Sequence, residues 1–432
     1  MSTVTRMMTV LAATALLSGC ALSAEGEDRE VSADAEEEAA VGVGPAEPGT
    51  LETREELSTF DFEATQIRQA ELIPESEEEN AGEPVGEHCL VSGEMNERTS
   101  DADGERYAIG FEMRLPADWA GRFLHQANGG RHAMVAASRS ADEYDGFLAV
   151  APGFNLPQAA VAQIWGAQQW DQVAEEPGDI TTALSAEERE VVADVHAGAV
   201  DSAGDPIYTS FPFDPGITNE DWGWWTFEAS VMLDPMAVGF VFSPEPADPA
   251  VLEDLPGYAL EMDIDEAAAG ISDEGIAGES AMEFMTPPAP YDLSELEAAG
   301  SKMMVVHGAS DAVFSADDTA RWYREVESQH EDARDFVRYF QVPGMAHVED
   351  GVATDQFDGL GALVDWVEHG EAPEHMEATA RGEGNPGGVN EELPDDWAAD
   401  RTRLLCPYPE AAHYEEGDPE DAASFSCRQG SG

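Results

Sequence analysis

A regular alternation of strand and helix patterns towards the C-terminus constrains the fold of this chain more than any other feature. The apolar run KMMVVHG (Lys302–Gly308) predicts a buried strand, and a helical pattern follows over Asp317–Ser328. The pair repeats as the strand FVRYFQVPG (Phe336–Gly344) and a helix over Thr354–His369. Strands joined through helices pair in parallel, because each helix carries the chain back along the sheet. The sequence therefore predicts an α/β fold with a mostly parallel sheet.

The rest of the chain divides into segments of different character. Residues 61–156 carry strand-like alternation, then a helical pattern over Gly129–Ser138 and a buried strand over Asp145–Gly153. Residues 157–290 are rich in Gly, Pro, Asp and Trp and lack the strand–helix alternation, which predicts an inserted lid or substrate domain. We therefore assign residues 61–156 and 291–432 to the core.

Two segments near the start of this core are expected to pair as antiparallel strands. CLVSGEM, which begins at Cys89, and YAIGFEMRLP, which begins at Tyr107, alternate apolar and polar residues. The polar loop residues Asn96–Gly104 lie between them. A small antiparallel sheet at the entry to the domain is therefore expected.

The first residues have the pattern of an export signal. Arg6 gives a positive start, Met7–Leu17 is apolar but too short for a permanent membrane span, and LSGC follows, ending at Cys20. This tetrapeptide resembles a bacterial lipobox, in which Cys20 becomes the lipidated first residue; a simple secretory signal cut nearby is the alternative. We assign residues 1–20 to a lipoprotein signal peptide and residues 21–60 to an acidic, disordered tether. The expected location is the periplasm or the outer membrane, with Cys20 as the link to the membrane.

The charge of the chain is extreme. It has 90 acidic residues against 20 basic ones, a formal net charge of −70, and Lys302 is its one lysine. Repulsion on this scale loosens a compact fold unless salt screens it. We therefore interpret the composition as that of a halophile's protein rather than an acidic protein of ordinary salt. Nucleic acid is not expected as a partner, because phosphate binding requires a basic surface.

The cysteines fit an exported protein. Cys20 is assigned as the lipidated residue. Cys406 and Cys427 lie 21 residues apart in the sequence, in a loop-rich region. An oxidising compartment favours a disulfide between these two, worth about 3 kcal/mol from loop closure. Cys89 has no evident partner.

Two short motifs supply an acid and a base. HGASD ends at Asp311 just after one predicted strand, and PGMAH ends at His347 just after the next. In α/β-hydrolases the chain order is nucleophile, acid, base, and the acid orients the base that deprotonates the nucleophile. We predict that Asp311 is the acid and His347 the base, and that the two lie within hydrogen-bonding reach.

Longer blocks around these motifs carry a resemblance to a known family. They are NGGRHAMVAASR, DEYDGFLAVAPGFNLPQAAVAQ, MMVVHGASDAVFSADDTARWY, QVPGMAHVEDGVATDQFDGLGALVDWVEHGEAPE and RTRLLCPYP. In this order they resemble the tannase and feruloyl esterase family of α/β-hydrolases, which includes terephthalate-monoester hydrolases. The resemblance spans roughly Glu87–Cys427. It implies an α/β-hydrolase fold with a lid, and hydrolysis of aromatic carboxylic esters through a Ser-His-Asp triad that requires no cofactor.

The nucleophile of that family is missing here. The family's elbow reads G-C-S-x-G-G-R, with the serine on a strained turn between strand and helix, whereas the similar residues of this chain are QANGGR (Gln126–Arg131). Ala127 takes the place of the serine, and Val348 takes the place of a cysteine that often pairs with the one before the serine. Other serines are interpreted as polar surface or loop residues rather than substitutes: Ser138, Ser140 and Ser310.

The sequence before the elbow indicates a deletion. RLPADWAGRFLHQ resembles the strand and glycine-rich loop that form part of the family's oxyanion hole, far upstream of the serine. About 90 residues, or two to three βα units, are therefore expected to be missing. They include the strand that carries the nucleophile, and Phe123–Gln126 would have to take its place. Asn128 and Gly129 remain candidates for an oxyanion N–H.

Two further expectations concern the lid. Family lids often carry a calcium loop of the form D-x-x-D-G-x-x-D-G; Asp201 and Asp205 keep the spacing of its last two aspartates, so a structural calcium is an expectation. Five tryptophans of the lid either line a pocket for an aromatic acyl group or belong to the core: Trp165, Trp170, Trp222, Trp224 and Trp225.

These observations predict an exported lipoprotein of α/β-hydrolase descent that is inactive, or nearly so, as an esterase. One alternative is a non-catalytic lipoprotein that binds aromatic ligands, and another is a misassembled gene whose true product is an active esterase. The expected ligand is a small aromatic ester or acid.

The net charge generates a prediction about salt. We expect the melting temperature to rise between about 0.1 M and 2 M NaCl, because the screening length falls several-fold over this range. Thermal unfolding followed by circular dichroism measures the effect. Sulfate is not a suitable salt for this test, since it also strengthens apolar burial. An unchanged melting temperature would remove the argument for a halophile's protein.

Overall fold

The structure is a computed structural model that describes residues 43–50, 61–75, 79–80, 83–100, 104–126, 129–173, 184–276 and 278–430. The predicted signal peptide with Cys20, most of the predicted tether, and Ala127 and Asn128 lie outside the described residues. No helix of the described part is long and apolar enough to cross a membrane. The chain forms two compact units, and the boundary between them in the sequence falls between Asn128 and Gly129.

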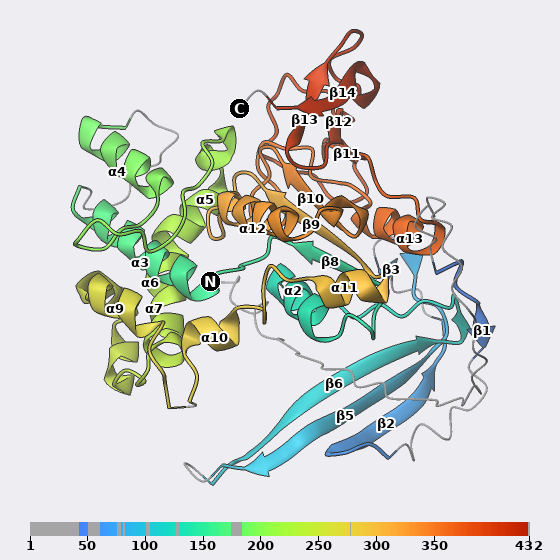
Figure 1. The fold of residues 1–432 in the computed structure, drawn as a ribbon, viewed down its shortest axis with the longest axis horizontal. Coiled ribbons are helices and arrows are strands. Elements are labelled where there is room, and N and C mark those ends of the chain that lie inside the picture. The colour runs from blue at the N-terminus through green and yellow to red at the C-terminus, as the bar shows by residue number, and fades with distance from the viewer. Residues whose placement is uncertain are drawn as a thin grey trace. The chain divides into compact units, whose positions relative to one another are not determined.

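The first unit is built on an antiparallel sheet (Figure 1). Its strands are β2 (Thr65–Ile73), β5 (His88–Thr99) and β6 (Arg106–Pro116), in the order β2-β5-β6. Two short pairs accompany it: β1 (Gly49–Thr50) with β7 (Asp118–Trp119), and β3 (Glu79–Asn80) with β4 (Glu83–Pro84).

The predicted antiparallel pairing in this unit is confirmed by β5 and β6. Cys89 and Val91 of β5 are buried together with Phe111 of β6, and the Cys89 thiol is free. Strand β5 extends further than expected, since Arg98 still pairs with Tyr107. An irregularity at Asn96, where φ is +51°, lets the ladder resume beyond it.

The second unit contains the predicted parallel sheet. Its strands are β8 (Gly146–Val150), β9 (Lys302–Gly308) and β10 (Val337–Val342), in the order β10-β9-β8, and both pairings are parallel. The helices around it are α2 (Gly130–Arg139), α11 (Ser294–Ala299), α12 (Ala316–Gln329) and α13 (Gly359–His369). The α/β fold is confirmed, with elements at Lys302–Gly308 and over Asp317–Ser328 where the sequence predicts them.

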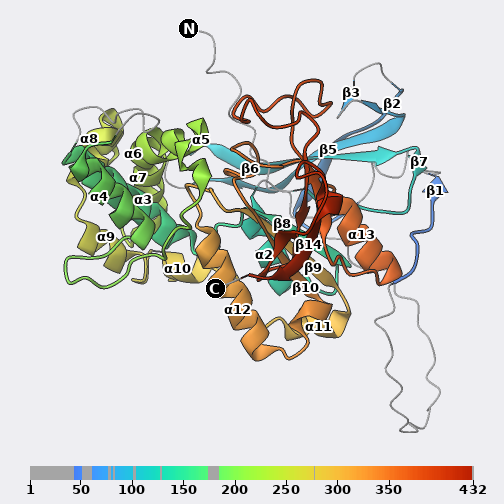
Figure 2. The same ribbon diagram turned by 90° about the horizontal axis from the view of Figure 1, so that it is seen from above.

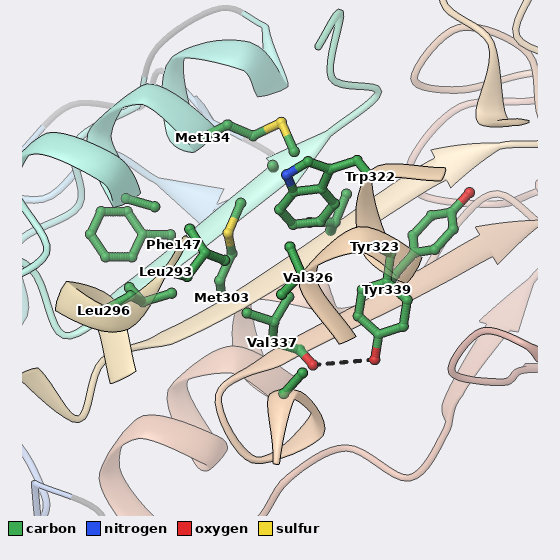
Figure 3. Close-up of a cluster of buried hydrophobic side chains, with 14 of the residues drawn as sticks. Met134, Phe147, Leu293, Leu296, Met303, Trp322, Tyr323, Val326, Val337 and Tyr339 are labelled. Atoms are coloured by element: carbon green, nitrogen blue, oxygen red, sulfur yellow. Dashed lines mark hydrogen bonds between the residues drawn. The ribbon is translucent and has the colours of Figure 1, made fainter. Parts of the chain in front are cut away.

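This sheet is buried on both faces. Met303 of β9 packs in one apolar cluster with Trp322 of α12, and the next residue, Met304, packs in another with Trp366 of α13. Every residue of β9 is buried, which accounts for the apolar run Met303–Val306 within it. Figure 3 shows the first cluster around the strands: Met134, Phe147, Leu293, Leu296, Met303, Trp322, Tyr323, Val326, Val337 and Tyr339. Burial of one such side chain stabilises the fold by about 1.5–3 kcal/mol.

A group of helices lies between β8 and β9 in the sequence and gathers beside the sheet of the second unit (Figure 2). Its α-helices are α3 (Leu156–Asp171), α4 (Ala186–Ala197), α5 (Glu220–Trp224), α6 (Ser230–Met232), α7 (Asp234–Ala237), α8 (Leu255–Glu261), α9 (Ile264–Gly270) and α10 (Ala281–Met285). Short 3-10 and π-helical turns connect them: η1 (Pro215–Thr218), η2 (Trp225–Ala229), η3 (Val238–Phe242) and η4 (Pro249–Glu253). The group has its own apolar cluster around α3, and it occupies the sequence range of the predicted lid.

Short strands complete the C-terminal part. β11 (Met376–Thr379) pairs with β12 (Thr402–Leu405), and β13 (Glu410–Tyr414) pairs with β14 (Phe425–Gln429), all antiparallel. The 3-10 turns η5 (Ala333–Asp335) and η6 (Ala422–Ser424) precede β10 and β14. The predicted disulfide between Cys406 and Cys427 is present, with Cα atoms 5.6 Å apart.

Two expectations about local structure are wrong. Helix α13 starts at Gly359 rather than Thr354, because Gln356 forms a bridge with Thr379 and Asp358 caps the helix. Phe123–Gln126 does not replace a missing strand: these residues are not in a strand, and the side chains of Phe123 and Leu124 are exposed. They follow Gly121, where a φ of +85° turns the chain.

Candidate active site

The predicted acid and base meet at the carboxyl end of the parallel sheet. Strands β9 and β10 end level with each other, since Gly308 pairs with Val342, and the loops that follow carry Asp311 and His347. The predicted hydrogen bond is present: Nδ1 of His347 lies 2.8 Å from Oδ2 of Asp311. A side chain at Gly308 would come within 2.2 Å of the Met345 carbonyl oxygen, so glycine is needed for the two loops to approach this closely.

Asp311 is an ionised carboxylate with no exposed surface. Its Oδ1 accepts the backbone N–H groups of Val313 and Phe314, both at 2.9 Å, and its Oδ2 faces the imidazoles of His307 and His347. Burial acts to raise the pKa of Asp311, but the positive charge of His347 and hydrogen bonds from both histidines outweigh it. The pKa of Asp311 is therefore well below its ordinary value.

His347 is held by two carboxylates. Burial acts to lower the pKa of His347, yet the charge and hydrogen bond of Asp311, with the charge of Asp221, raise it above its ordinary value. Asp221 belongs to α5 and accepts the backbone N–H of His347 at 3.1 Å. Burial in turn raises the pKa of Asp221, against the effect of that hydrogen bond. The helical group thus supplies a carboxylate that fixes the base.

Two residues of this site are missing from the sequence-based prediction. His307 is a fully buried polar residue that follows the apolar residues Met303–Val306 of β9, and this isolated position in the sequence is a signal that could have identified it. Asp221 has no such signal, because it is one of 90 acidic residues and lies more than a hundred positions from His347. Only the folded arrangement of α5 brings it to the base.

The loop that carries His347 is strained and firmly tied. Val348 has a φ of +70°, which is rare for a β-branched residue. The backbone N–H of Ala346 donates to the backbone carbonyl oxygen of Asp350. The Asp350 carboxylate pairs with Arg381, which also binds the buried Asp355, with 2.9 Å between Nε and Oδ2. These contacts hold a conformation that the isolated loop would disfavour.

Aromatic rings flank the base. Trp225 and Phe314 meet the His347 ring edge to face, with centroids 5.2 and 5.5 Å away. Trp224 in turn contacts Trp225, with ring centroids 4.6 Å apart. Trp170 is buried in an apolar cluster. Trp225 therefore lies against the base with Trp224 next to it, whereas Trp170 belongs to the core; a pocket for an aromatic acyl group stays a prediction.

The helical group contains cavities of different size. One has room for about one water, about 20 Å³, between Trp165 and Trp222. Another has a volume of about 230 Å³ and is lined by residues that include Phe240 and Phe284. The side chain of His347 is 22% exposed, so a ligand can also reach the open side of the base.

The three serines that the sequence offers as substitutes for the nucleophile occupy structural positions. Ser138 donates to the Met134 carbonyl oxygen within α2, and Ser140 ends that helix. Ser310 is buried and its hydroxyl donates to the Asp214 carboxylate. These contacts agree with the structural roles that the sequence suggested for the three serines.

Of the two predicted oxyanion residues, the structure describes Gly129. Asn128 lies outside the described residues, and Gly129 precedes the first turn of α2 with a φ of +97°. Arg131 fixes this end of α2 by donating to the carbonyl oxygens of Phe284 and Met285 on α10. The oxyanion role of Asn128 and Gly129 stays a prediction.

The aspartates suggested for calcium lie in a turn. Oδ1 of Asp201 accepts the backbone N–H groups of Ala203 and Asp205 at 2.9 and 2.8 Å. Among the described residues, no three His, Cys, Asp or Glu side chains gather as a group that could hold a metal ion. The calcium role of Asp201 and Asp205 stays a prediction.

The strain at Val348 generates a prediction. We expect Val348→Asn to stabilise the protein by about 1 kcal/mol, because asparagine tolerates a positive φ and Val348 is 43% exposed, so little burial is lost. Urea unfolding in about 2 M NaCl measures the difference.

Val389 provides the matched control for this substitution. It is 47% exposed and has no positive φ, so Val389→Asn should change stability by less than about 0.5 kcal/mol. Equal effects of the two substitutions would show that Val348 stores no strain.

Known proteins show which family this site belongs to. The family model "Tannase and feruloyl esterase" matches residues 168–428. Mono(2-hydroxyethyl) terephthalate hydrolase of Piscinibacter sakaiensis is 29% identical over 390 residues, which cover 71% of this chain and 63% of that protein. A probable feruloyl esterase of Arthroderma benhamiae is 35% identical over 143 residues, 32% of this chain and 24% of that protein. The chain thus spans less than two thirds of the length of these relatives.

Solved structures show the same fold. An esterase from Aspergillus oryzae has a TM-score of 0.60 at 16% identity, covering 87% of this chain and 99% of that chain. Feruloyl esterase B from Aspergillus oryzae has a TM-score of 0.59 at 16% identity, covering 86% and 98%. Since the family model covers more than half of the sequence, this chain belongs to the tannase and feruloyl esterase family.

Proposed function

We propose that this chain binds small aromatic carboxylic esters or acids beside His347 and does not hydrolyse them through a serine acyl-enzyme. One observation carries the proposal. The pair of Asp311 and His347 is formed, with 2.8 Å between Nδ1 and Oδ2, while Ala127 stands where the family has its serine. The acid and base of an esterase are thus present without the group that they would activate.

The arrangement has consequences for both binding and chemistry. With the proton on Nδ1 directed at Asp311, Nε2 of His347 is the atom available to a ligand. When Nε2 is protonated it can donate to an ester carbonyl or a carboxylate, and Trp225 and Phe314 offer ring edges and faces to an aromatic group. Without a serine Oγ no acyl bond forms, so only binding and electrostatic stabilisation remain for catalysis.

The relatives support the class of ligand. One is a mono(2-hydroxyethyl) terephthalate hydrolase and another a probable feruloyl esterase, and both names denote esters of aromatic acids. We propose for this chain the recognition of an aromatic carboxylic ester or acid, but not its hydrolysis.

The missing serine generates a prediction about activity. The protein should not hydrolyse feruloyl, galloyl or p-nitrophenyl esters in a serine-dependent way, because Ala127 takes the place of the family's serine and the hydroxyls of Ser138 and Ser310 donate to other groups. Activity assays and labelling with a fluorophosphonate probe, both in about 2 M NaCl, test this. A probe bound covalently to a defined serine would refute the proposal.

Binding is the positive half of the same test. Ferulate should quench tryptophan fluorescence in the parent protein, and Trp225→Leu should reduce the quenching, since Trp225 lies against His347. Trp397→Leu is the matched control, because Trp397 belongs to the same unit, is partly exposed and packs against Arg401. If both substitutions change the titration equally, binding is not at His347.

A separate proposal concerns location and rests on residues outside the described structure. We infer from LSGC and the preceding apolar run that the chain is exported and lipid-anchored through Cys20. Expressed in a bacterial host, the parent should incorporate labelled palmitate and sediment with membranes, and Cys20→Ser should do neither. Equal labelling of both forms would contradict lipidation at Cys20.

A further inference from the structure

His307 connects the acid of the site to helix α12. It is the sixth residue of β9 and has no exposed surface. Its Nε2 lies 3.1 Å from Oδ2 of Asp311 and 3.0 Å from the carbonyl oxygen of Phe314. Its Nδ1 lies 2.8 Å from Oγ1 of Thr319 on α12. Each ring nitrogen therefore has a defined polar neighbour.

These neighbours decide where the proton of His307 resides. Nε2 faces two oxygens that can only accept, the Asp311 carboxylate and the Phe314 carbonyl, so Nε2 carries the proton. The Thr319 hydroxyl can donate, and Nδ1 is the partner within reach. The neutral ring with its proton on Nε2 satisfies all of these atoms, whereas the opposite tautomer would leave Nε2 facing two acceptors without a hydrogen.

The two histidines share one carboxylate oxygen. Oδ2 of Asp311 accepts from His307 at 3.1 Å and from His347 at 2.8 Å, while Oδ1 is occupied by two backbone N–H groups. A donor on Oδ2 withdraws charge from the oxygen that holds the proton of His347. The carboxylate then attracts that proton less strongly than it would with His347 alone.

We propose that His307 is a positioning residue: as the neutral tautomer protonated on Nε2, it fixes the plane of the Asp311 carboxylate and limits how strongly Asp311 holds a proton on His347. This role belongs to the same site as the proposed function and rests on that function. Its tests need neither ester nor aromatic ligand, so a failure to bind ferulate would leave it standing.

Other groups around the pair have to be accounted for. Asp221 on α5 faces His347 and also favours its protonated form. Tyr208 is fully buried and its pKa is far above the ordinary value, first through burial, so it stays neutral near Asp311. The aromatic neighbours Trp225 and Phe314 are uncharged. Asp311 and Asp221 are thus the charges that set the protonation of His347.

The first experiment uses the unaltered protein. Long-range proton–nitrogen NMR correlations distinguish the tautomers of each histidine, and through-bond correlations from the ring to the backbone assign the signals of His307. In about 2 M NaCl near pH 7, His307 should give the pattern of a neutral ring protonated on Nε2. A ring protonated on Nδ1, or a doubly protonated ring, would overturn the proposal without any need for a variant that folds.

The second experiment compares two substitutions at this position. Gln places an amide donor near the position of Nε2, whereas Leu fills similar space with no donor. Followed by NMR, the pKa of His347 should rise by about half a unit or more in His307→Leu, because Asp311 no longer shares its charge. His307→Gln should stay near the parent value.

A control variant checks that the readout responds to charge. Asp221→Asn removes the second carboxylate and should lower the pKa of His347, opposite in sign to His307→Leu. His330, which pairs with Glu297 away from the site, serves as an internal reference. A pKa of His347 that stays unchanged or falls in His307→Leu, or that rises equally in His307→Gln, would show that His307 only fills space.

Discussion

The site depends on keeping one carboxylate ionised where water cannot reach it. A carboxylate with no exposed surface pays a large desolvation cost, and several hydrogen-bond donors are needed to offset it. Asp311 has four, two from the backbone of its own turn and two from imidazoles. The parallel pairing of β9 and β10 brings these donors together, and Gly308 lets the loops approach closely enough.

The acidic side chains of this protein hold several of its loops by accepting hydrogen bonds from backbone N–H groups. With few cations available, carboxylates accept backbone N–H groups instead of pairing with lysines. Asp221 accepts from His347, and Asp214 accepts from Gly344 at 3.3 Å. Glu392 joins two segments by accepting from Glu220 at 2.6 Å and Gly351 at 2.9 Å. These hydrogen bonds act between groups in direct contact. Salt that screens the long-range repulsion between carboxylates therefore weakens the hydrogen bonds less than it weakens that repulsion.

The sequence predicts the parallel sheet well because its signal is strong and local. Strand β9 reads as a continuous apolar run, and α12 shows clear helical periodicity with a serine cap at Ser315. The pair of Asp311 and His347 follows from these strands, since residues after neighbouring parallel strands meet at one edge.

What the sequence does not reveal depends on contacts between distant segments. The start of α13 shifts to Gly359 because Gln356 pairs with Thr379, a contact that no local pattern indicates. Asp221 is indistinguishable from many other acidic residues until α5 places it at His347. Phe123–Gln126 does not form a strand although Phe123 and Leu124 are apolar, since apolar character alone does not specify a strand.

Hydrogen bonds among the described residues set the geometry of the acid and base. The described donors to Asp311 come from its own turn, from β9 and from the loop after β10. His347 is fixed by Asp311 and by Asp221 of α5. All of these groups belong to the second unit and lie on segments far along the chain from Ala127. The parallel strands and the loops that follow them are therefore enough to bring the acid and base together.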